Sequence, residues 1–60
     1  MNKETVKEFY LMAQADIDNG FYLLEMYLVL DWYAEQKNYE ACYGIQLAIE
    51  ERIIQTFNKI

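Results

Sequence analysis

The chain has 60 residues, of which five are basic and ten acidic, giving a net charge of -5. A chain of this length forms at most one domain and folds alone only marginally. Its single cysteine, Cys42, excludes an internal disulfide, and the absence of histidine removes a common zinc ligand. Ten residues are aromatic, which is more than a small interior can hide. We therefore expect one domain, residues 1–60, that forms a homodimer.

The charge pattern argues against direct nucleic-acid binding, because phosphate recognition needs clustered basic side chains. The basic residues are scattered: Lys3, Lys7, Lys37, Arg52 and Lys59. The first residues lack the apolar core of a signal peptide. The apolar run Phe21–Tyr33 is shorter than the roughly 20 residues that span a bilayer, and Glu25 and Asp31 interrupt it. The sequence predicts a cytoplasmic protein that does not enter a membrane, and a lone thiol suits a reducing compartment.

Helix is predicted almost throughout, because proline is absent and glycine occurs only at Gly20 and Gly44. The first helix is expected over residues 3–18. Asn2 can cap it, or a capping box over 5–8 can do so instead. Helical spacing places five residues on one face, namely Val6, Phe9, Tyr10, Ala13 and Ile17. The sequence 18–20, Asp-Asn-Gly, should end this helix through a left-handed residue.

The second predicted helix, residues 21–36, is apolar around most of its circumference, and such helices are buried centrally or between chains. The third is expected over residues 39–57, with Asn38 as its cap. Its apolar seam is Cys42, Ile45, Ile49, Ile53 and Phe57, and its small residues Ala41, Gly44 and Ala48 allow another helix to approach closely. The predicted fold class is all-α: a small three-helix bundle made of an N-terminal helix and an antiparallel helical hairpin.

The predicted hairpin resembles part of a tetratricopeptide repeat. The resemblance is carried by Leu28-x3-Trp32, a short polar turn, and Ala41-x3-Ile45-x2-Ala48. The sequence departs from that pattern at Glu25, Val29 and Ile53, and an array of at least three repeats does not fit into sixty residues. What the resemblance implies is therefore a packed pair of helices.

No motif in the sequence predicts catalysis. The run 16–20 has carboxylates at alternate positions, as at the start of a calcium-binding loop. Such a loop needs glycine at its sixth position and glutamate at its twelfth, whereas counting from Asp16 places glycine fifth and Tyr27 twelfth. The end of a helix explains the run instead. Glu4, Glu8 and the pair 50–51 are expected on solvent faces, without the cleft that acid–base chemistry needs. Cys42 lies on an apolar seam and has no histidine base. We expect no enzyme activity, cofactor, metal or small-molecule substrate.

The tyrosines point to a protein interface. There are six of them, with one tryptophan among them. Aromatic side chains with a polar tip are enriched where a surface is buried against a partner. The alternative is that they only cover a small core. We expect the residues left uncovered by the other helices, Tyr22, Tyr27 and Trp32, to bind a protein partner.

Three functions stay open on this basis. The leading hypothesis is a non-enzymatic, acidic regulatory protein that binds a protein partner through an aromatic-rich helical surface. The second is an inhibitor of the anti-CRISPR or anti-restriction type, from a phage or mobile element, whose acidic residues Glu25, Asp31 and Glu35 block a nucleic-acid-binding site. This second hypothesis rests on analogy of class alone. The third is a structural or antitoxin-like subunit of a larger complex.

Overall fold

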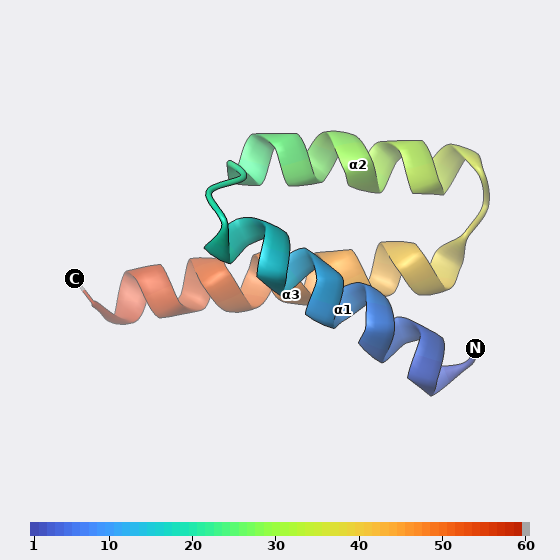
Figure 1. Cartoon of the computed structure of the whole chain (residues 1–60), viewed down its shortest axis with the longest axis horizontal. Helices are drawn as coiled ribbons and strands as arrows, with labels where there is room; N and C mark the ends of the chain where they lie inside the picture. The colour runs from blue at the N-terminus through green and yellow to red at the C-terminus, as the bar shows by residue number, and fades with distance from the viewer. Residues whose placement is uncertain (60) are drawn as a thin grey trace.

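A computed structural model describes residues 1–59 and shows three helices, α1 (Lys3–Asp18), α2 (Leu23–Glu35) and α3 (Tyr39–Asn58). No strand occurs in this part of the chain. Figure 1 shows α2 running back in the opposite direction to α1 and α3. The predicted all-α class and the helical bundle are confirmed.

Asparagine side chains begin two of the helices. The Asn2 side-chain oxygen accepts hydrogen bonds from the backbone N–H groups of Glu4, at 2.9 Å, and Thr5, at 3.2 Å. Asn38 does the same for Ala41 at 3.2 Å. These oxygens satisfy N–H groups that have no partner inside the helix. Of the two caps considered for the first helix, Asn2 is therefore the one that forms.

The end of α1 sets the start of α2. Gly20 has φ +104°, its N–H donates to the Ile17 carbonyl at 3.1 Å, and the Phe21 N–H donates to the Asp16 carbonyl at 3.1 Å. This is the Schellman arrangement, which needs a left-handed residue after the helix. Because the Phe21 amide closes α1, α2 begins at Leu23. The predicted start at residue 21 was wrong by two residues.

The same arrangement ends α2, but with a lysine in the left-handed position. Lys37 has φ 58°, and its N–H donates to the Ala34 carbonyl at 3.0 Å. The Asn38 N–H donates to the Tyr33 carbonyl, also at 3.0 Å. α2 therefore ends at Glu35 instead of residue 36, and α3 continues one residue beyond the predicted 57. A left-handed residue with a Cβ costs roughly 1–2 kcal/mol, so this turn carries strain.

The closest helix contact lies between α1 and α3, whereas α1 and α2 barely touch. A Cβ on Gly44 would lie 2.5 Å from the Val6 carbonyl oxygen and 2.9 Å from the Tyr10 backbone nitrogen. Glycine therefore lets the α1 backbone approach α3, as the small residues predicted. The buried apolar side chains are Ala13, Ile17, Met26, Ala41, Ile45, Ala48 and Ile49.

The expected burial of residues 21–33 holds for one side of α2 only. Met26 is its single buried side chain, and Leu23, Leu30 and Tyr33 are half-buried against the core. The seam predicted for α3 is also shorter than expected, because Phe57 is 71% exposed. In Figure 1 the last turns of α3 project beyond the other helices.

Candidate interaction surfaces

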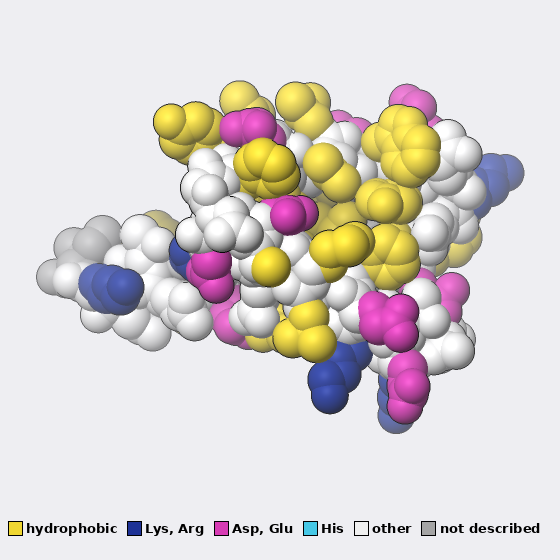
Figure 2. All heavy atoms as spheres, viewed as in Figure 1, with side chains coloured by type: hydrophobic (Ala, Val, Ile, Leu, Met, Phe, Trp, Pro, Cys, Tyr) yellow, Lys and Arg dark blue, Asp and Glu magenta, His cyan; other side chains and the backbone are white. Residues whose placement is uncertain are grey.

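The outer side of α2 exposes large apolar side chains that a free protein rarely leaves in water. Figure 2 shows apolar side chains gathered over α2, with a few carboxylates among them. We call this set the α2 surface. Its apolar members and their exposed fractions are Tyr22 76%, Leu24 73%, Leu28 63%, Trp32 56% and Tyr27 44%. Contiguous exposed apolar groups of this kind are typical of interaction sites.

Helix geometry explains why these residues face outward. Leu24 and Leu28 lie two residues before and after Met26, and each residue turns the helix by about 100°. Once Met26 is buried against the core, both leucines point away from it. Trp32 follows Leu28 by one turn. Its ring packs edge-on against the Tyr33 ring, with the two ring centroids 5.0 Å apart. The Tyr33 ring in turn packs edge-on against the ring of Phe9 in α1, with a centroid distance of 5.3 Å.

All six residues predicted to bind a partner are exposed. The three acidic ones do not form a single row. Asp31 and Glu35 are four residues apart and share a helix side, whereas Glu25 is turned roughly 80–120° away from them. The Glu25 carboxylate also accepts a hydrogen bond from the Tyr22 backbone N–H at 3.4 Å. An inhibitor that occupies a nucleic-acid-binding site needs its carboxylates on one face, and of these three only Asp31 and Glu35 share one.

A second exposed surface lies between α1 and α3 and was not predicted. It is an open groove of about 550 Å³ with lysines along α1 and carboxylates along α3. We call it the α1–α3 surface. It includes Lys3, Val6, Lys7, Leu47, Glu50 and Ile54. Leu47 and Ile54, spaced i and i+7, were the only sequence sign of this outward face of α3.

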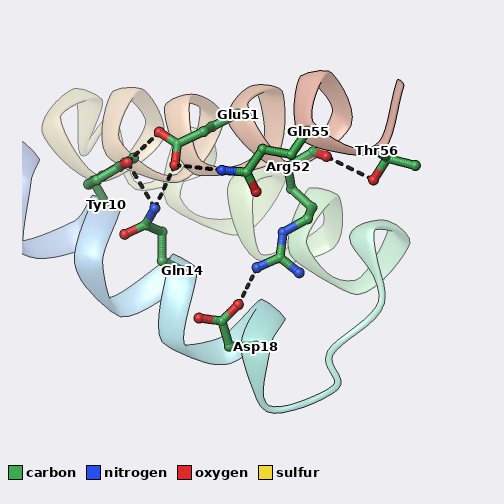
Figure 3. A network of polar contacts seen from close by, with 7 residues as sticks. All are labelled: Tyr10, Gln14, Asp18, Glu51, Arg52, Gln55 and Thr56. Carbon is green, nitrogen blue, oxygen red and sulfur yellow. Dashed lines mark hydrogen bonds and ion pairs between the residues drawn. The ribbon is translucent and has the colours of Figure 1, made fainter. Parts of the chain in front are cut away.

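A hydrogen-bond network closes one part of this groove and joins α1 to α3 (Figure 3). The Tyr10 hydroxyl donates to Glu51, and the Gln14 amide donates to both the Tyr10 oxygen and Glu51, each at 2.8 Å. The bond to Glu51 raises the pKa of Tyr10, and partial burial and the carboxylate charge act in the same direction. Glu51 was expected on a solvent face. That prediction was wrong, because α1 packs beside it.

The remaining polar features tie the helices together locally. Arg52 forms an ion pair with Asp18, which links α3 to the end of α1 (Figure 3). Cys42 is half-buried, with its Sγ 3.8 Å from the Leu30 carbonyl oxygen. In residues 1–59 no three potential ligand side chains lie close enough together to hold a metal ion. Within the same residues, no helix combines the length and apolar character needed to cross a membrane.

Comparison with known proteins gives no family assignment. The sequence matches no protein-family model, and no curated protein or solved structure is significantly similar to it. The tetratricopeptide-like spacing over residues 28–48 therefore has no family match behind it, and only the antiparallel course of α2 and α3 agrees with it (Figure 1).

Proposed function

We propose that this chain is a non-enzymatic interaction protein that binds a protein partner through the α2 surface and forms a homodimer. The observation that supports the binding role is the state of α2: Met26 is buried, while Leu24, Leu28 and Trp32 are all more than half exposed. Spaced i, i+4 and i+8, these three side chains form an apolar stripe along the outer side of α2.

The energetics favour a partner over permanent exposure. Covering a large apolar side chain gains about 1.5–3 kcal/mol relative to leaving it in water. The gain is largest where a rigid aromatic side chain enters a pocket of the partner. Trp32 is suited to this role, because its ring contacts the Tyr33 ring, which in turn packs against Phe9. Tyr22 and Tyr27, at the edges, offer hydroxyl groups to a wetter rim.

The acidic residues give the α2 surface a negative charge. Glu25, Asp31 and Glu35 are the only charged residues within Leu23–Glu35. Opposite charges across an interface steer association and select the partner more than they add affinity. The proposed partner therefore presents an apolar pocket with Lys or Arg near its edge.

An affinity capture with paired variants tests this function. The tagged chain, its Leu24→Gln/Leu28→Gln variant and a Leu11→Gln/Met12→Gln control are incubated with lysate of the source cells. Leu11 and Met12 are each 50% exposed on α1, outside the α2 surface. We expect proteins captured by the wild type and by the control to fall at least tenfold with the α2 variant. Capture that is equal for all three, with circular dichroism showing folded chains, contradicts the proposal.

A further inference from the structure

The α1–α3 surface carries charges of both signs, separated between its two sides. Lys3 and Lys7 lie on α1, and Glu50 lies on α3. Within residues 1–59 none of these three takes part in an ion pair, since the single pair there joins Arg52 to Asp18. Glu50 accepts a hydrogen bond from Gln46 at 3.1 Å on its own helix, and both side chains are exposed.

The neighbouring acid, Glu51, already has hydrogen-bond partners within the chain. It accepts hydrogen bonds from the Tyr10 hydroxyl and the Gln14 amide of α1. Glu50 is thus the carboxylate of the groove that is free to meet a cation from outside. Between the lysines and Glu50 lie apolar side chains, of which Ile54 is 59% and Leu47 37% exposed.

We infer that the α1–α3 surface binds a second copy of this chain. This inference rests on the proposed homodimer and assigns its interface. In a two-fold dimer the same patch meets itself, and when the axis runs along the groove each side of the patch faces the opposite side of the other copy. The α1 lysines of one protomer then face Glu50 of its partner, and the reverse contact repeats this. The apolar side chains of the two α1–α3 pairs fill the space between them as a four-helix layer.

The α2 surface is unsuited to the same role. It carries Glu25, Asp31 and Glu35 with no basic residue in the helix. Pairing α2 with itself would bring three carboxylates from each copy together, and like charges across an interface are unfavourable. A standard interface covers about 800 Å² per partner, roughly a sixth of the 4656 Å² of exposed surface here. A dimer through α1 and α3 therefore leaves the α2 surface free.

Gel filtration coupled to light scattering measures the oligomeric state and so shows which of the two surfaces forms the dimer. Ile54→Glu places a charge in the proposed interface, and Leu28→Glu is the matched control, because these residues are 59% and 63% exposed. We expect a dimeric wild type, a dimeric Leu28→Glu variant and a monomeric Ile54→Glu variant. A dimer that survives Ile54→Glu but is lost with Leu28→Glu overturns the assignment and leaves the proposed homodimer standing. A monomeric wild type overturns both.

Charge reversal gives a second test that does not depend on the apolar core of the interface. Lys7→Glu should weaken the dimer by about tenfold, which corresponds to about 1.4 kcal/mol. Adding Glu50→Lys should restore most of the affinity, because the signs are then exchanged across the same contact. The dissociation constants are measured by analytical ultracentrifugation. Equal constants for all three proteins, or a double variant weaker than Lys7→Glu alone, contradict the inference.

Discussion

α2 and the α1–α3 pair are held in the fold by different means. The α1–α3 pair has a close backbone approach at Gly44, an ion pair and a hydrogen-bonded tyrosine. α2 is attached through one buried side chain, Met26, and three half-buried ones. α1 and α3 supply most of the core, whereas most of α2 faces outward. We propose that this division lets so short a chain keep a stable core and still bind a partner through α2.

The largest effect on the contact between α1 and α3 is expected from Gly44→Ala. The added Cβ would meet backbone atoms of α1 at 2.5 and 2.9 Å, which cannot move aside without separating the helices. Overpacking of this kind costs about 3 kcal/mol, reduced by about 1 kcal/mol because alanine favours helix. Thermal unfolding followed by circular dichroism should show a clear drop in Tm.

Gly20→Ala is the control for that experiment. Gly20 has open space around its Cβ position but a φ of +104°. The cost there is backbone strain of about 1 kcal/mol, without a clash. A Gly44→Ala variant as stable as Gly20→Ala would mean that α1 does not approach α3 as described.

A smaller effect with a characteristic pH dependence is expected from Tyr10→Phe. The variant loses the hydroxyl that donates to Glu51 and should be less stable at neutral pH. In the folded protein the pKa of Tyr10 is raised above 10.0. Its stabilising contribution is therefore complete below pH 10 and is lost as the pH rises through the folded-state value. Urea unfolding of both proteins should show a stability difference that shrinks above pH 10, and a constant difference would contradict the network.

The turn between α2 and α3 offers a stabilising change. Lys37→Gly removes the strain of a left-handed lysine, partly offset by the greater freedom of glycine in the unfolded chain. The net gain should be about 0.5–1 kcal/mol, which raises the Tm of a chain this size by roughly 2–8 °C. Lys37→Ala keeps the Cβ and should bring no such gain. A gain from both variants would place the cause in the lost charge.

The smallest effect is expected at the centre of the α2 surface. Leu28→Ala should change the free energy of unfolding by less than about 0.5 kcal/mol, because Leu28 is 63% exposed. Met26→Ala on the same helix should cost about 3 kcal/mol, because that side chain is 2% exposed. Chemical denaturation measures both. Similar costs for the two variants would mean that Leu28 is covered in the folded protein.

Local chemistry made much of the fold predictable. Asn2, Asn38 and Gly20 are residues whose capping and turn preferences act within a few positions, and all three take those roles. Gly44 was recognisable as a point of close approach, although the identity of the approaching helix depended on how α1 crosses α3. Lys37 was not recognisable, because nothing intrinsic to lysine favours a positive φ.

The surfaces were predictable only in part. Periodicity identified Tyr22, Tyr27 and Trp32 as candidates for exposure, because α2 has more apolar sides than two helices can cover. The contact between Tyr10 and Glu51 joins residues 41 positions apart, so only the relative register of α1 and α3 brings them together. The α1–α3 surface was missed for the same reason, since its lysines and Glu50 belong to different helices.

The fluorescence of Trp32, the only tryptophan, tests the division into two surfaces most directly. Acrylamide quenching and the emission maximum are measured over a dilution series that spans the dimer and the monomer. Because Trp32 is 56% exposed and lies on the α2 surface, we predict strong quenching and red-shifted emission that stay constant across the series. A blue shift and loss of quenching as the dimer forms would place α2 in the dimer interface and contradict the account.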